Sequence, residues 1–280
     1  MWAGGKSKLI KKYAPHFPDI SNFKGYAEPF FGGGAIYGSI AEKFDGKLAI
    51  NDRNSDLMGV FEALKANPDE LKKDTRRVLE TVLSGESKDE RKAIYYSELK
   101  KYWSTDKPGE LLALMKLGFN GIWQTKKESA GKFATPAGLL NQKDANAVLD
   151  KVDFDGWHQA LQRTTIGSSD YRDLEFEPEG TLVYLDPPYR DSFTTYSGEF
   201  GDKEQEEVTV YAKDLRDRGA TVLLANRYVD GDTFFEDLLP DATFHPFDVT
   251  YTAGRRKKVE DGFEAKKARE FLAILTPEGS

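Results

Sequence analysis

The feature that most constrains the fold is a glycine-rich loop between two short apolar segments. Residues 23–27 have the composition of a strand, 31–34 read Phe-Gly-Gly-Gly, and 35–44 carry apolar residues at helical spacing. A second apolar segment, 47–50, ends next to Asp52. A strand, a tight loop, a helix and a second strand in this order predict the opening of a parallel, doubly wound α/β sheet.

A mostly helical region interrupts this sheet. Helical patterns cover 57–65, 69–83, 90–102 and 110–117, and a polar, lysine-bearing hairpin or loop follows near 121–138. Further strand patterns lie at 163–166, 181–185, 221–225, 244–251 and 270–275, with a helix near 204–218. We therefore expect a Rossmann-like, mostly parallel sheet built from 1–54 and 160–280, and an inserted helical domain over 55–159.

Composition excludes several classes of site. The chain has 280 residues and no cysteine, which rules out disulfides, thiolate metal sites and cysteine nucleophiles. The three histidines have no ligand spacing, so we expect no metal, and no apolar run approaches the roughly 20 residues of a membrane helix. A net charge of −7 disfavours a non-specific nucleic-acid coat, although basic residues gather at 6–12, 126–132 and 255–258.

The glycine loop has the setting of a nucleotide-binding loop. Glycines let the backbone turn tightly and approach a ligand closely, and Asp52 lies about 20 positions further on, where an acidic side chain accepts ribose hydroxyls. Tyr37 occupies the last glycine position of the dinucleotide pattern, and no Lys-Ser or Lys-Thr follows, so a P-loop is excluded. A tight structural turn is the alternative interpretation.

The tetrapeptide Asp186-Pro187-Pro188-Tyr189 directly follows the apolar segment 181–185. This position predicts the carboxyl edge of the sheet, where ligands bind in α/β proteins. The Asp186 carboxylate and a proline carbonyl can accept both hydrogens of an exocyclic amine, which leaves the nitrogen lone pair available for attack. The prolines have no N–H that would compete, and Tyr189 offers a flat ring for stacking. A rigid turn capped by the aspartate is the alternative.

Taken together, these motifs resemble the Dam-type DNA adenine methyltransferases, the class whose cofactor motif precedes the recognition region. The resemblance implies S-adenosylmethionine as cofactor, S-adenosylhomocysteine as product, and transfer to N6 of a flipped-out adenine in double-stranded DNA. It implies cofactor contacts by Trp2, Lys6, Glu28, Phe30, Phe31, Gly32, Gly33, Gly34, Asp52, Asp170, Tyr171 and Asp186. Glu270-Phe271-Leu272 is similar to the family's closing segment.

The helical insertion is then the DNA-recognition lobe. We expect DNA contacts from Asn120, Trp123, Gln124, Lys126, Lys127, Lys132, Arg255 and Arg256. Trp123-Gln124-Thr125 and Phe133-Ala134 depart from the family's pattern, so the sequence that relatives recognise is not carried over.

Three alternatives share parts of this chemistry. They are methylation of N4 of cytosine, methylation of an RNA base or a protein amide, and a DNA-binding module of the same fold without turnover. Methylation at C5 of cytosine is excluded because it requires a cysteine nucleophile. We expect a cytoplasmic monomer or weak dimer, in a bacterium or a virus-infected host cell, with restriction–modification as one possible setting and no membrane partner.

Overall fold

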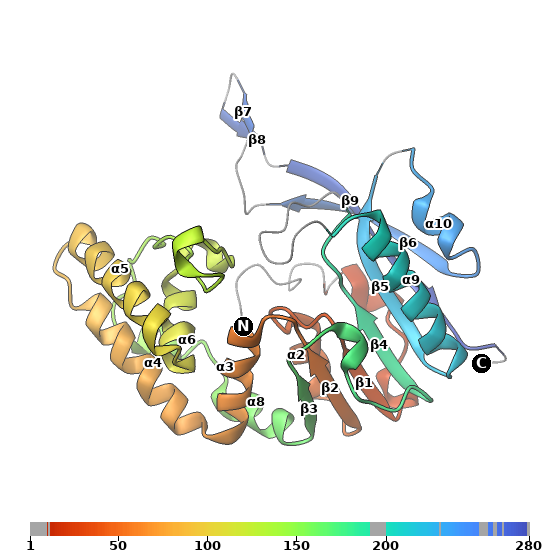
Figure 1. The fold of residues 1–280 in the computed structure, drawn as a ribbon, viewed down its shortest axis with the longest axis horizontal. Helices are drawn as coiled ribbons and strands as arrows, with labels where there is room; N and C mark the ends of the chain where they lie inside the picture. The colour runs from red at the N-terminus through yellow and green to blue at the C-terminus, as the bar shows by residue number, and fades with distance from the viewer. Residues whose placement is uncertain are drawn as a thin grey trace. The chain divides into compact units, whose positions relative to one another are not determined.

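The computed structural model describes residues 10, 12–190, 200–229, 231–251, 257–259, 262–264 and 266–278. Within these residues a seven-stranded sheet has the order β3-β2-β1-β4-β5-β9-β6 (Figure 1). Its strands are β1 (Gly25–Glu28), β2 (Lys47–Asn51), β3 (Thr164–Gly167), β4 (Thr181–Leu185), β5 (Thr221–Tyr228), β6 (Thr243–Tyr251) and β9 (Lys266–Leu275).

The sheet is mostly parallel with an antiparallel edge. Strand β1 pairs in parallel with β2 and β4, and β4 pairs in parallel with β5. Strand β9 runs antiparallel between β5 and β6. Two short strands, β7 (Lys257–Val259) and β8 (Gly262–Glu264), form a separate antiparallel pair. The predicted Rossmann-like α/β fold is confirmed.

Burial of β4 on both faces explains its unbroken apolar run. All of its residues are buried, and Gly180, with φ of 72°, turns the chain into its first residue. Helix α9 (Asp202–Asp217) lies along β5 (Figure 1), and its Val208 and Leu215 belong to the hydrophobic core. Burying each such side chain contributes roughly 1.5–3 kcal/mol. These strands therefore form a rigid platform for the loops at their carboxyl ends.

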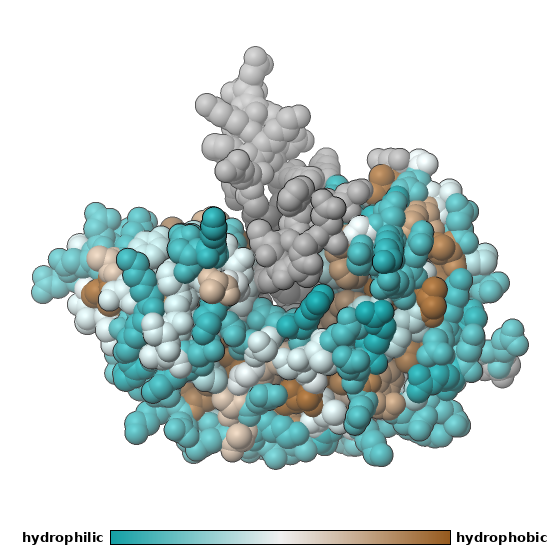
Figure 2. All heavy atoms as spheres, viewed as in Figure 1, coloured by the Kyte–Doolittle hydropathy of each residue, from teal (hydrophilic) through white to brown (hydrophobic). Residues whose placement is uncertain are grey.

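The helical part of the chain follows the sequence pattern closely. Its longer helices are α3 (Ser55–Ala66), α4 (Pro68–Leu83), α5 (Lys88–Thr105), α6 (Pro108–Leu117) and α8 (Phe154–Gln162). The N-cap side chains of Asn54, Asn67, Ser87 and Asp153 each accept a backbone N–H in the first turn. Hydrophilic residues cover most of the visible surface of these helices (Figure 2). The sequence patterns did not predict α8, α7 (Asn146–Leu149) or α10 (Phe234–Leu238).

Contacts between residues divide the chain into two compact units. One unit comprises Met1–Ser7, Gly32–Lys43 and Asn51–Asp170, and the other comprises Lys8–Phe31, Phe44–Ile50 and Tyr171–Ser280. The glycine-loop helix α2 (Ala35–Ala41) belongs to the first unit, with the helical segments. The functional assignment of 55–159 as a recognition domain stays a prediction. No helix in the described part of the chain is long and apolar enough to cross a membrane.

Candidate active site

The loop after β1 has the backbone conformation that its glycines predict. Gly32 and Gly34 have φ of 50° and 63°, in the left-handed region that favours glycine, and Gly34 is the N-cap of α2. An added Cβ on Gly32 would meet no atom within 4 Å. The space beside the Gly32 backbone is therefore open, so crowding by neighbouring atoms is not the reason that a glycine occupies this position.

Asp52 holds the same loop. The Gly32 N–H donates to Asp52 Oδ2 at 2.8 Å, and the Asn54 N–H donates to Asp52 Oδ1 at 2.9 Å. Burial raises the pKa of the Asp52 carboxyl, while both N–H groups act in the opposite direction. The carboxylate keeps further acceptor capacity, since each oxygen has two lone pairs and accepts one backbone donor from these residues.

Asn51 fixes the turn that leads to Asp170. Its Nδ2 donates to the Ser169 carbonyl at 3.1 Å, and its Oδ1 accepts the Ser169 N–H at 3.0 Å. Asn51 is buried, and a Cβ on Gly167 would come within 2.6 Å of its Oδ1, so this turn requires a glycine at its start. Asn51 ends strand β2, and no sequence pattern predicted this role.

Phe30 and Tyr171, which both belong to the second of the two compact units, stack on each other. Their ring centroids lie 4.7 Å apart at 30°, and Tyr211 packs edge-on against Tyr171 at 5.1 Å. Phe30 follows β1, whereas Tyr171 begins the short helix η5 (Tyr171–Asp173). Two residues that the resemblance assigned to the cofactor are thus side by side, although they are far apart in the sequence.

The predicted catalytic tetrapeptide begins directly after β4. In the parallel pairing of β1 with β4, Ala27 is opposite Val183, so Glu28 and Asp186 both lie at the carboxyl ends of neighbouring strands. Glu28 is buried and accepts a hydrogen bond from the Tyr26 hydroxyl. The Tyr184 hydroxyl is buried beside this edge and has no hydrogen-bond partner among the described residues. Burial, and then the neighbouring Asp186, raise the Tyr184 pKa, so this hydroxyl stays protonated.

Two side chains remote in sequence hold the tetrapeptide. Gln205 on α9 donates to the Pro188 carbonyl at 2.7 Å. Glu270 on β9 accepts the Tyr189 hydroxyl at 2.8 Å through Oε1 and the Tyr13 hydroxyl at 3.0 Å through Oε2. Glu270 is fully buried, and hydrogen bonds to a buried carboxylate are stronger than neutral ones. The Tyr189 ring is therefore held at its far end.

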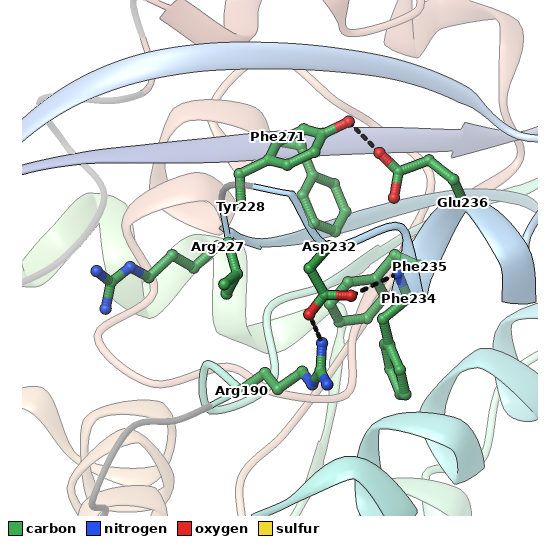
Figure 3. A pocket seen from close by; sticks show the side chains of 9 residues that line it. Arg190, Arg227, Tyr228, Asp232, Phe234, Phe235, Glu236 and Phe271 are labelled. Carbon is green, nitrogen blue, oxygen red and sulfur yellow. Dashed lines mark hydrogen bonds and ion pairs between the residues drawn. The ribbon is translucent and has the colours of Figure 1, made fainter.

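Arg190 follows the tetrapeptide and is anchored on three sides. Its guanidinium pairs with Asp202 at 2.6 Å and with Asp232, and it lies 4.0 Å from the centroid of the Phe234 ring. These pairs raise the Arg190 pKa above its already high ordinary value. Arg190, Asp232 and Phe234 border a small pocket, and Figure 3 shows Arg190 and Asp232 pointing toward each other there. Its volume, about 10 Å³, is sufficient only for a water molecule.

The lysine-bearing segment of the helical unit is an irregular loop closed by a single bridge between Gly118 and Ala137. The Ala134 N–H donates to the Gln124 carbonyl at 2.7 Å, and the Trp123 ring packs edge-on against Phe133 at 5.3 Å. The Trp123 ring therefore has a packing role in this loop.

Most of the predicted DNA-contacting side chains of this loop are exposed. They are Asn120, which has a φ of 52°, Gln124, Lys126 and Lys127. Lys132 pairs instead with Asp106 at 2.9 Å. Phe119 is also exposed, at 47%, although no sequence pattern predicted a role for it. Trp2, Lys6, Arg255 and Arg256 lie outside the described residues. No group of three or more His, Cys, Asp or Glu residues in the described part of the chain could hold a metal ion.

Comparison with known proteins identifies the family. The chain is 28% identical over 246 residues to the Type II methyltransferase M.MjaIII of Methanocaldococcus jannaschii, covering 81% of this chain and 83% of that protein. It is 26% identical to M1.LlaDCHI of Lactococcus lactis subsp. cremoris, covering 91% and 88%. It is 24% identical to the retron Ec67 DNA adenine methylase of Escherichia coli, covering 98% and 89%. The family model of D12 class N6 adenine-specific DNA methyltransferases matches residues 2–253, and the chain belongs to this family.

Proposed function

We propose that this methyltransferase transfers the methyl group of S-adenosylmethionine to N6 of an adenine flipped out of double-stranded DNA, and releases S-adenosylhomocysteine. The observation that carries this proposal is the Asp186–Tyr189 turn, held by buried partners at the carboxyl edge of β4, beside the end of β1. Family membership favours adenine N6 over cytosine N4, an RNA base or a protein amide, and favours an enzyme over a binding module.

The residues of the glycine loop and its neighbours fit this cofactor. The open space at Gly32 allows a ligand to approach the backbone, and the Asp52 carboxylate can accept ribose hydroxyls. By resemblance to the family we also assign Glu28, Phe30, Phe31, Gly33 and Gly34 to the cofactor, and the Phe30 ring is stacked on Tyr171. We assign the cofactor's adenine to Asp170 and Tyr171, and the methionine part to Trp2 and Lys6, by resemblance to the family.

The tetrapeptide prepares the amine for attack. The Asp186 carboxylate accepts one N6 hydrogen, which keeps the nitrogen lone pair out of the adenine ring. We assign the second hydrogen to the Pro187 carbonyl, while the neighbouring Pro188 carbonyl accepts from Gln205. Tyr189 stacks on the base. Bound S-adenosylmethionine supplies an electrophilic methyl group on a positively charged sulfur. The protein contributes positioning and electrostatic stabilisation, and requires no covalent enzyme intermediate.

We propose that the loop from 118 to 138 contacts the DNA. Lys126 and Lys127 are exposed and suited to phosphates, while Asn120 and Gln124 can reach base edges. The exposed Phe119 ring offers an apolar surface that can stack on bases. Flipping the adenine costs a few kcal/mol of unstacking, which these contacts must offset. We assign phosphate contacts to Lys132, Arg255 and Arg256 by resemblance, and Trp123 to supporting the loop.

The setting of this reaction is also a proposal. Since two of the relatives are named Type II methyltransferases, we place the enzyme in restriction–modification, in the cytoplasm of a bacterium or a virus-infected cell. We expect a monomer or weak dimer that uses no metal.

The replacement Asp186→Ala tests the proposed mechanism. We expect it to abolish transfer of tritiated methyl groups to duplex DNA, while calorimetry still detects cofactor binding. Loss of cofactor binding together with transfer would contradict the assigned role, and transfer to cytosine, RNA or protein by the unaltered enzyme would favour the corresponding alternative.

A further inference from the structure

Two buried amide side chains lie behind the tetrapeptide, and no motif includes them. Gln205 on α9 and Asn226 on β5 both have 0% of their surface exposed. A buried amide that lacks hydrogen bonds costs about 1–3 kcal/mol in proteins. Two such groups in contact inside the protein therefore require a specific set of hydrogen-bond partners.

The partners determine how each amide is oriented. Pro188 presents a carbonyl, which can only accept, so Gln205 must turn its Nε2 toward it, at 2.7 Å. The Gln205 Oε1 then accepts from Asn226 Nδ2 at 3.0 Å. The Asn226 Oδ1 accepts the Arg227 N–H at 2.8 Å. Donors and acceptors alternate from the backbone of β5 to the tetrapeptide, and reversing either amide would place two like groups against each other.

The tetrapeptide depends on this anchor because of its composition. Pro187 and Pro188 have no N–H, so the turn cannot be held through two of the backbone donors that a turn normally offers. The proline carbonyls can still accept hydrogen bonds, and the partner of the Pro188 carbonyl comes from a helix that follows later in the chain. The position of Asp186 relative to the amine is thereby linked to the Gln205 side chain.

We propose that Gln205 is a positioning residue for adenine methylation, and that Asn226 orients it. This inference rests on the proposed function. Gln205 does not contact the reacting atoms. It holds the Pro188 carbonyl, so that the Pro187 carbonyl and the Asp186 carboxylate keep the spacing that the two N6 hydrogens require.

The replacements Gln205→Met and Thr209→Val test this inference on one helix. Methionine preserves the length of the side chain but removes the donor. Thr209, also buried on α9, donates to the Glu206 carbonyl at 2.8 Å and serves as the control for a lost buried hydrogen bond. We expect Gln205→Met to lower kcat about 10- to 100-fold, the range that a displacement near 1 Å produces. Cofactor Kd and KM for DNA should stay within about threefold, and Thr209→Val should keep its kcat.

The replacement Gln205→Glu adds a pH test that a purely structural role would not satisfy. A protonated glutamic acid can donate to the Pro188 carbonyl, whereas an ionised carboxylate would repel it. The ratio of variant to unaltered kcat should therefore fall as the pH rises, with thermal unfolding used to confirm that the variant is folded. Asn226→Leu should lower kcat as well, and combining it with Gln205→Met should add little, since the two act as a unit.

The outcomes separate the inference from the proposed function. If folded Gln205→Met has the kcat of the unaltered enzyme, or if Thr209→Val loses as much kcat as Gln205→Met does, the inference is overturned while the methyltransferase assignment stands. If Gln205→Met does not fold, a pH-independent kcat ratio in Gln205→Glu overturns it instead. Failure of the unaltered protein to methylate adenine refutes the proposed function and the inference with it.

Discussion

The replacement Gly32→Ala provides the sharpest test of the cofactor assignment. Alanine keeps the N–H that donates to Asp52, so the change adds only a methyl group at a position where no atom lies within 4 Å. A left-handed φ of 50° costs a non-glycine residue roughly 1–2 kcal/mol. Because alanine makes the unfolded chain less flexible than glycine does, roughly 0.4–1 kcal/mol of this cost is offset. We therefore expect a net loss of roughly 0–1.6 kcal/mol, or no more than about 6 °C in Tm.

Cofactor binding should suffer far more than stability. If the cofactor lies against the loop, the added methyl group overlaps it, and overpacking of this kind costs about 1–3 kcal/mol. The Kd measured by calorimetry should then rise about 5- to 150-fold. Gly131→Ala is the matched control, because Gly131 also has a positive φ, of 87°, and open space around its Cβ position, but lies in the lysine-bearing loop. Equal cofactor affinity in the two variants would refute the placement of the cofactor over Gly32.

Two further predictions concern charge. Because burial raises the Asp52 pKa, the folded protein binds this proton more tightly than the unfolded chain does; the carboxyl favours folding below the unfolded pKa and loses that contribution as the pH rises through the folded pKa. Ribose hydroxyls that donate to the ionised Asp52 carboxylate should lower this pKa, so cofactor binding should strengthen with rising pH and release protons. Calorimetry in buffers of different ionisation enthalpy measures this proton release. Asp52→Asn should remove the proton release, and proton uptake on cofactor binding would contradict the prediction. Replacing the exposed Lys126 and Lys127 with glutamine should weaken DNA binding and reduce the slope of log K against log salt by about 0.9 for each lost phosphate contact, whereas an unchanged slope in salt titrations would show that these lysines do not contact phosphates.

Local patterns were sufficient to predict the main elements of the sheet. Strand β4 has the predicted bounds, 181–185, because a mostly apolar run of strand-forming residues between Gly180 and Asp186-Pro187 has few alternatives to a buried strand. Helix α6 was found because its apolar residues repeat over several turns, whereas α8 was missed. Helix α8 has only nine residues, and polar residues separate Phe154, Trp157 and Ala160, so its buried face is recognised only once α3 is seen to pack against it.

The sequence by itself determined where the chemistry-bearing groups follow strands, because a glycine loop or an Asp-Pro-Pro-Tyr turn is encoded by adjacent residues whose backbone preferences act locally. Only the tertiary structure decided which distant groups support that turn. Gln205, Asn226 and Glu270 are ordinary polar residues of helices and strands, and no local spacing distinguishes them from solvated ones. Their roles arise when folding removes water and leaves each buried polar atom only the partners that the packed core provides, a selection made by the whole fold.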